Sequence, residues 1–372
     1  MYMWSKPQMS ILWGSHPKIS KNTLVNLLFS DRTLTAMKRH TIGITPILFL
    51  SMIIGQQDFE KVGTSGAHFL DISPDARVMG MANSVVGTKI SDASAVFYNP
   101  AALVHMNSTN IFFSRVDWFA GINYHSISGG LKTPIGNMAI HMRQLSTGDI
   151  NETTVQAQQG TGRSFIWNDL ALGISWANSL TDRFSFGANI SLINESIDLY
   201  DYEASAWAVD IGTLYITGFN SLKLGMSVRN FGPELDFEKN GKDATFDDYH
   251  DGELLPEPES FRAYHMPLMF QMGISYDFFE ELTNHKLMFA IDAVHPNDSS
   301  ERLNLGMEYG FIDILFLRGG LYSNHNSASF MGGIGLNLGE ITPIANDFRF
   351  DMAVSNYGLL GFVKQFTIVI GL

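Results

Sequence analysis

The chain has 372 residues, a formal net charge of −13 and no cysteine. The acidic balance argues against a nucleic-acid surface, which needs clustered lysine and arginine. The lack of cysteine excludes disulfides, thiolate metal sites and a cysteine nucleophile. No run of 18 or more apolar residues occurs, so the sequence predicts no membrane-spanning helix.

A positively charged start, Met37-Lys38-Arg39-His40, precedes an apolar stretch that runs from Ile42 to Ile54. This is the layout of a secretory signal peptide, which we predict over residues 37–55. Because this signal begins at an internal methionine, we interpret residues 1–36 as the product of a start site assigned too early. A genuine N-terminal extension is the alternative.

Residues 56–108 differ from everything that follows, because their apolar residues do not alternate. They show helix-like spacing, many small residues and a break at Pro100. We predict short helices and turns that form one compact element.

From about Thr109 to the C-terminus, large apolar side chains fall on every second position. A period of two predicts β-strands with one apolar face. The opposite face is rich in glycine, serine and asparagine, as in the stretch 302–311. The strands reach about 9–11 residues, which is the length that a tilted strand needs to cross a bilayer.

Fourteen such stretches are predicted, and an even number is what a closed bacterial barrel requires. They lie at residues 109–117, 122–132, 138–147, 166–177, 184–196, 205–217, 222–231, 267–278, 286–294, 302–311, 313–322, 328–338, 347–356 and 363–372. If the first strand runs outward, both long connections, 148–165 and 232–265, fall on the outside, as in outer-membrane barrels. The fold class predicted for residues 109–372 is therefore all-β: a 14-stranded antiparallel transmembrane β-barrel of the bacterial outer membrane.

Several short motifs carry a family resemblance. They are Lys61-Val62-Gly63-Thr64-Ser65-Gly66-Ala67, Ala76-Arg77 with Gly80-Met81, Asp92-Ala93-Ser94-Ala95 and Asn99-Pro100-Ala101, followed in the barrel by Ala208-Val209-Asp210-Ile211-Gly212 and Arg229-Asn230-Phe231-Gly232. On these motifs the chain resembles the PorV/PorQ family, within the FadL-like outer-membrane barrels, over residues 58–372. It departs from the family pattern at Ala82, where a second glycine is common. It also departs at Leu372, where many barrels end on an aromatic residue.

The resemblance implies a 14-stranded barrel whose N-terminal element, residues 56–108, is a plug. It also implies a role in type IX protein secretion or surface attachment, through binding of translocon proteins or the C-terminal signal domains of cargo. The alternative is a FadL-like transporter of hydrophobic small molecules across the outer membrane. The expected partners are outer-membrane lipid and secretion-system proteins, with no nucleic acid. The sequence offers no nucleophile–base constellation, so we expect no enzyme, and we expect no cofactor.

Asn99-Pro100-Ala101 is the most specific motif of the predicted plug. Proline removes a backbone donor and fixes a turn, while asparagine can cap the helix that follows. The motif is either a rigid turn that anchors the plug to the wall or a hinge that opens a path.

Charged and polar side chains recur on the predicted inner faces. A charge that faces lipid at the midplane would cost roughly 2–4 kcal/mol for arginine or lysine, so these groups are expected to face inward or to sit near the rims. We predict paired charges that hold the plug to the wall, with a selective pore as the alternative. The candidates are Arg77, Arg115, His141, Arg143, Asp210, Arg229, Asp277, Asp292, Glu308, Arg318 and Asp351.

The connection 234–259 is strongly acidic. Oxygen-rich spacing can bind calcium, but the segment lacks the twelve-residue loop pattern with its glycine and terminal glutamate. We therefore favour a solvated loop that contacts a partner, and calcium binding is the alternative. The eleven histidines show no metal-binding spacing, so no metal site is predicted.

Overall fold

The computed structural model describes residues 62–106, 108–239, 242–243, 245–246, 249–250, 253–254, 259–279, 284–325, 328–339 and 347–372. The predicted extension at residues 1–36 and the predicted signal peptide at 37–55 lie outside the described residues. None of the described helices has the length and the apolar character needed to cross a membrane.

Fourteen strands of the described chain form a closed antiparallel barrel, as predicted. Each pairs with the next along the chain, and the last pairs with the first. They are β1 (Asn110–Asp117), β2 (Asn123–Thr133), β3 (Gly136–Ser146), β6 (Trp167–Ser179), β7 (Phe184–Ile197), β8 (Tyr202–Ile216), β9 (Lys223–Phe231), β16 (Met269–Phe278), β17 (His285–Pro296), β18 (Arg302–Phe311), β19 (Leu315–Ser323), β20 (Phe330–Asn337), β21 (Asp347–Asn356) and β22 (Phe362–Gly371).

The barrel strands bury one face and expose the other. In β1, Phe112 and Val116 are fully buried, whereas Ile111 and Phe113 are 43% and 46% exposed. Successive side chains of a strand point to opposite faces of the sheet, so the exposed apolar residues form the outer face of the barrel. The buried residues line the bore.

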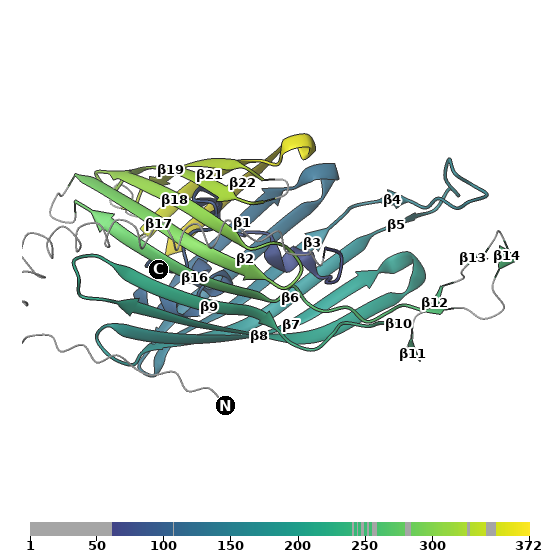
Figure 1. The fold of residues 1–372 in the computed structure, drawn as a ribbon, viewed down its shortest axis with the longest axis horizontal. Helices are drawn as coiled ribbons and strands as arrows, with labels where there is room; N and C mark the ends of the chain where they lie inside the picture. The colour runs from purple at the N-terminus through teal and green to yellow at the C-terminus, as the bar shows by residue number, and fades with distance from the viewer. Residues whose placement is uncertain are drawn as a thin grey trace, which may run out of the picture. The chain divides into compact units, whose positions relative to one another are not determined.

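Both long connections lie at one end of the barrel, which we call the long-loop end (Figure 1). One carries the hairpin of β4 (Ile150–Asn151) and β5 (Ser164–Phe165). The other carries six short strands, namely β10 (Phe237–Lys239), β11 (Lys242–Asp243), β12 (Thr245–Phe246), β13 (Tyr249–His250), β14 (Glu253–Leu254) and β15 (Glu259–Ser260). Three short helices lie in connections that the alternation of strand direction assigns to the same end. They are η4 (Phe119–Gly121) between β1 and β2, η5 (Asp198–Tyr200) between β7 and β8, and η6 (Gly358–Leu360) between β21 and β22.

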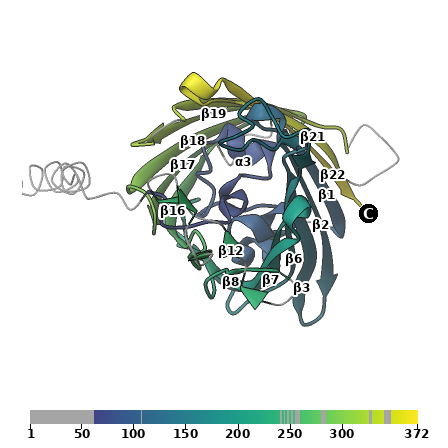
Figure 2. The ribbon, with the colours of Figure 1, turned by 90° about the vertical axis from the view of Figure 1, so that its right-hand side faces the viewer.

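The described N-terminal residues 62–106, which we call the plug, run through the bore (Figure 2). They form η1 (His68–Asp71), α3 (Ala76–Gly80), η2 (Ala93–Phe97) and η3 (Pro100–His105). The last three helices begin with the same local device. The side chains of Asp75, Asp92 and Asn99 each accept a hydrogen bond from the backbone N–H two residues later. This cap satisfies a backbone donor that the first helical turn leaves without a partner.

The plug rests directly on the backbone of the wall, at inward-facing glycines that we call the glycine belt. A Cβ atom added at Gly225 would collide with the carbonyl oxygen of Val86, and one added at Gly320 would meet the backbone of Met81 and Ala82 within 2.8 Å. A side chain at either position would therefore push the plug away from the wall. The belt comprises Gly130, Gly187, Gly212, Gly225, Gly273, Gly306, Gly320 and Gly333. It explains the glycine-rich face of the alternating strands.

We expect Gly225→Ala to loosen the plug, because overpacking a filled interior typically costs about 1–3 kcal/mol. The measurement is the temperature at which the folded, fast-migrating form of the barrel is lost on a gel, together with protease cleavage of the plug. Gly319→Ala on β19 is the matched control, since a Cβ there meets nothing within 4 Å. Equal behaviour of the two variants would contradict the close contact between plug and wall.

Candidate functional site

Six charged side chains form an unbroken series between plug and wall, which we call the charge chain. It runs in the order Arg77, Glu308, Arg318, Asp351, Arg349 and Asp92, so that positive and negative groups alternate. Its two ends belong to the plug and its four central members to β18, β19 and β21. Three arginines balance three carboxylates, and the chain as a whole is neutral.

The contacts within the charge chain are short and buried. The Arg77 guanidinium donates through Nε and Nη2 to the two oxygens of Glu308, both at 2.8 Å. Arg318 donates to Glu308 and to Asp351, both at 2.6 Å, and its side chain is 1% exposed. Charge-assisted, two-pronged contacts of this kind are among the strongest in proteins. Because the partners are desolvated, loss of one member would leave its neighbours with less compensation for a buried charge.

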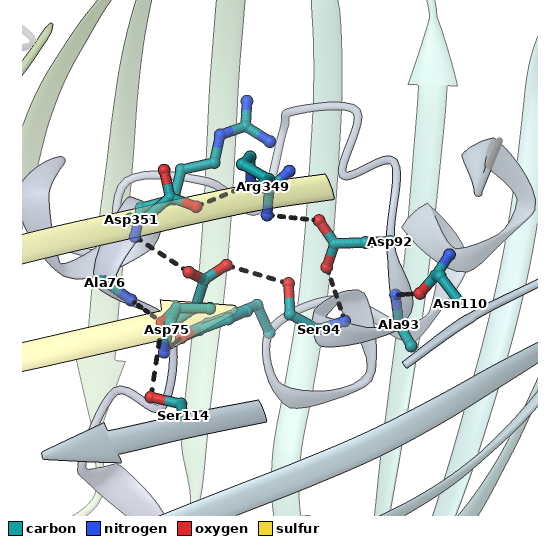
Figure 3. Close-up of polar contacts among 12 residues, drawn as sticks. Asp75, Ala76, Asp92, Ala93, Ser94, Asn110, Ser114, Arg349 and Asp351 are labelled. Carbon is teal, nitrogen blue, oxygen red and sulfur yellow. Dashed lines mark hydrogen bonds and ion pairs between the residues drawn. The ribbon is translucent and has the colours of Figure 1, made fainter. Parts of the chain in front are cut away.

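Arg349 is the member that joins the plug carboxylate to the wall carboxylate (Figure 3). Its Nη2 lies 2.7 Å from Asp92 Oδ2, and its Nε lies 2.7 Å from Asp351 Oδ2. On β20, the strand between β19 and β21, Gly335 gives the Arg318 side chain room. A Cβ at Gly335 of β20 would meet Arg318 Nη1 at 2.6 Å and would also collide with the Asp351 carboxylate. Arg318 thus reaches across β20 to Asp351.

Asp75 lies next to the charge chain and links two plug helices. Its Oδ1 accepts the Arg77 N–H at 2.9 Å, and its Oδ2 accepts the Ser94 hydroxyl at 3.0 Å. Burial, with the Asp92 charge as the second cause, raises the pKa of Asp75 to about 6. Burial also opposes the charge on Asp92, but Arg349 and Ser94 outweigh it and lower the pKa of Asp92. Of these two carboxylates, Asp75 therefore has the higher pKa.

The Asn99-Pro100-Ala101 motif lies against the wall of β7 and β8. Asn99 Nδ2 donates to the carbonyl oxygens of Val86 in the plug, at 2.8 Å, and Thr213 in the wall, at 3.0 Å. The Pro100 and Ala101 backbone fits over Gly187. The motif thus caps η3 and seats it on the glycine belt.

The structure brings two further predicted arginines to the plug. Arg143 donates to the Leu70 carbonyl oxygen at 3.0 Å, and its guanidinium lies 5.7 Å from the ring centre of Phe97. Arg229 donates to the carbonyl oxygen of Phe97, also at 3.0 Å. The two arginines therefore reach the plug backbone from β3 and β9.

Asp210 faces the bore but contacts the wall rather than the plug. Its carboxylate accepts hydrogen bonds from the Asn230 backbone, at 2.6 Å, and from the Asn189 side chain, at 2.8 Å. Asn230 lies at the register shift between β8 and β9, with a φ of 61°. Asp210 thus stabilises a bulge in the wall.

Arg115 does not make the predicted contact with plug or bore. It pairs with Asp117 at 2.8 Å, and the two side chains are 53% and 45% exposed. Arg115 is two residues from Phe113 and therefore shares the outer face of β1 with it. It lies near the end of β1 that leads into η4, so of the two predicted positions, inward or near a rim, it takes the second.

The long-loop end carries a hollow of about 790 Å³ that is lined by six carboxylates, Asp198, Asp201, Glu203, Glu234, Asp236 and Glu238. Glu234 pairs with His265 at 3.1 Å. The side chains of residues 240–260, which include most of the predicted acidic loop, lie outside the described part. Among the described residues, no group of three or more histidine or carboxylate side chains is placed to hold a metal ion.

Sequence reasoning missed Arg349, Asp75 and the pairing role of Asp92. A signal for Arg349 was present, because it lies two residues before Asp351 and so shares its face of β21. No comparable signal identifies Asp92 as its partner, since 257 residues separate the two.

Comparison with known proteins decides the family. The family model described as type IX secretion system protein PorV matches residues 55–248, more than half of the 372 residues. The chain belongs to the PorV family. The match covers the plug and the wall from β1 to β9, which places Arg77, Asp92 and the Asn99 motif within the family segment. The PorV family and the barrel indicate the bacterial outer membrane.

Solved structures share the fold of this PorV-family chain at low identity. The toluene transporter TbuX of Ralstonia pickettii is 12% identical, with a TM-score of 0.52 and coverage of 81% of this chain and 98% of that one. The toluene transporter TodX of Pseudomonas putida is 15% identical, with a TM-score of 0.51 and coverage of 78% and 96%. A FadL homologue of Pseudomonas aeruginosa is 12% identical, with a TM-score of 0.48 and coverage of 80% and 98%. No curated protein matches in sequence.

Arg349→Met in the PorV-family barrel should destabilise the folded state by about 3–5 kcal/mol, because it leaves the buried Asp92 carboxylate without its arginine and removes one of the two arginines that pair with Asp351. Urea unfolding in detergent micelles measures this loss. The matched control is Arg115→Met, whose exposed pair with Asp117 should be worth about 1 kcal/mol or less. Equal losses in the two variants would show that the charge chain does not hold the plug.

The raised pKa of Asp75 predicts how the stability of the folded chain depends on pH. The pKa of Asp75 is raised from 3.8 to about 6 in the folded chain. Between these two pH values the folded state therefore holds a proton on Asp75 that the unfolded state has lost. This contribution to stability is fully present below pH 3.8 and is lost as the pH rises through 6. Asp75→Asn should remove that part of the dependence, measured as the difference in urea midpoint between pH 5 and pH 7.5. An unchanged difference in the variant would contradict the assignment.

Proposed function

We propose that this PorV-family barrel supports type IX secretion as a non-catalytic interaction protein. Its outer face meets outer-membrane lipid, its bore stays closed by the plug, and its long-loop end binds translocon proteins or the C-terminal signal domains of cargo. The family match supports the secretion role. The fixed plug supports a function that is performed at the surface rather than through the bore.

The observation that carries this proposal is the charge chain. Because its first and last members belong to the plug, moving the plug would break both the Arg77–Glu308 and the Arg349–Asp92 contacts. Breaking a buried pair costs about 3–5 kcal/mol. The backbone of the plug also lies against the glycine belt, so a displaced plug would lose close packing along several strands. A function that leaves the plug in place avoids both costs.

The second candidate is transport of a hydrophobic small molecule. The likeness to TbuX and TodX, which are described as toluene transporters, favours it. A transporter of this architecture needs a continuous path from the long loops to the far side or to the bilayer. In this chain the plug would have to move to open that path.

Locking the plug to the wall separates the two candidates. The backbone N–H of Ala76 in the plug donates to the hydroxyl of Thr367 on β22 at 2.9 Å, and we choose these two neighbouring positions for a pair of cysteines. The chain has no cysteine of its own, which leaves the Ala76→Cys/Thr367→Cys pair as the only disulfide. We expect the oxidised double variant to secrete cargo with C-terminal signal domains as the unmodified strain does, because the proposed function leaves the plug in place.

The single variants Ala76→Cys and Thr367→Cys control for the substitutions themselves. Secretion that fails in the oxidised double variant and returns with a reductant would show that the plug has to move. A deletion strain with normal secretion but lost uptake of a hydrophobic compound would refute the secretion role and support the transporter.

A further inference from the structure

A hollow of about 720 Å³ opens on the outer face of the barrel, across β1, β2, β3, β6 and β7. Among its lining residues is Gly129 of β2, which lies two residues from the exposed Ile127 and therefore faces outward with it. A Cβ added at Gly129 meets nothing within 4 Å. The missing side chain leaves a depression between the larger residues around it.

The walls of the hollow are two rows of aliphatic side chains that follow the strand register. One row passes through Gly129 and contains Ile111, Ile140, Ile174 and Ile190. The other contains Ile127, Met142, Leu172 and Leu192. Most of these side chains are well exposed, for example Ile140 at 68% and Leu192 at 67%. The polar lining residues Ser128, His141 and Ser191 are buried on the inner face, beneath the floor.

The register also places the hollow within the apolar band of the outer face. The outer face turns polar at one row of residues that are neighbours in the strand register. This row consists of Arg115 on β1, His125 on β2 and Gln144 on β3. The Gly129 row lies four residues from this polar row, or about 13 Å along a strand. The hollow is thus continuous with the surface that faces the hydrocarbon of the membrane.

The dimensions and chemistry of the hollow fit a flexible hydrocarbon chain. It crosses five strands, whose four spacings of about 4.8 Å span about 19 Å. Protein partners in membranes pack closely through small residues and add hydrogen bonds between polar side chains. Here the outward-facing rows hold isoleucine, leucine and methionine around one glycine, with no outward hydrogen-bonding group. An acyl chain needs no such group and conforms to the depression.

We propose that this hollow is a binding groove for an acyl chain of an outer-membrane lipid. The groove rests on the placement of the barrel in the membrane and not on the secretion role. Filling the groove should therefore release the lipid and leave secretion intact, so that the two proposals fail separately.

Gly129→Leu places a side chain in the groove from a position where an added Cβ meets nothing within 4 Å, and Gly319→Leu is the matched control. Gly319 on β19 is also an outward-facing glycine with nothing within 4 Å, but it lies outside the hollow. Both variants and the unmodified barrel are reconstituted in vesicles of phosphatidylethanolamine and phosphatidylglycerol. The vesicles contain a phospholipid that is spin-labelled near the end of its acyl chain. The readout is the number of motionally restricted lipids per barrel.

We expect Gly129→Leu to lose about one restricted lipid per barrel, while Gly319→Leu matches the unmodified protein, because only the first variant fills a groove. Labels on either head-group type should give the same loss, since the contacts are made by the chain. Gly129→Val is the second variant, should the leucine prevent folding, and heat-dependent gel migration checks that each barrel is folded.

Equal numbers of restricted lipids in all variants would overturn the proposal. It would also be overturned if Gly129→Leu released a co-purifying membrane protein, or split a dimer of this chain, without changing the lipid signal. Either result would assign the hollow to a protein partner.

Discussion

The hydrogen-bonded seam between β1 and β22 is the constraint on which the rest of the structure depends. Within hydrocarbon, a backbone group without a partner costs several kcal/mol, so a sheet that crosses the membrane has to close on itself. All eight residues of β1 pair with β22, and the N–H of Leu372 continues the series to the Thr109 carbonyl oxygen at 2.7 Å. The last residue of the chain thus completes the wall.

Closing fourteen strands creates a bore that this chain fills with its own N-terminal residues. Two kinds of contact hold the plug, and each solves a different problem. At the glycine belt, backbone meets backbone, which brings the plug against the wall without a gap. Along the charge chain, arginines and carboxylates that would be costly alone are desolvated together and paired. The result is an interior in which the charges of the charge chain balance, beside a hollow of about 510 Å³ that Arg77, Glu308, Arg318 and Arg349 help to line.

Glycines on the inner and outer faces of the barrel wall have different roles. On the inner face, Gly225 and Gly320 leave room that the plug occupies. On the outer face, Gly129 leaves room that no part of the described chain fills. A bore that holds the plug, combined with an open outer groove and long surface loops, fits a protein that works through its surfaces. Membership of the PorV family links the chain to type IX secretion.

The sequence by itself determined the strands, their alternation and the parity of the loops, because a period of two is a local property that no distant contact can change. It also indicated the cap at Asn99, which acts over two residues, whereas the caps at Asp75 and Asp92 are of the same local kind but were not predicted. It did not place Arg115, because both faces of β1 carry large apolar residues: Phe112 and Val116 meet the interior, and Ile111 and Phe113 meet the outside. Only the tertiary structure decided which face was which.

The partners of the charge chain were likewise decided by the tertiary structure alone. Arg77 and Glu308 are 231 residues apart, and Arg349 and Asp92 are 257 apart. Each charge is visible in the sequence, and the face of its strand follows from alternation. Which charges meet depends on the register of β18 to β21 and on where the plug lies in the bore. Both are set by the closure of the whole barrel, which is a property of all fourteen strands together and of no single segment.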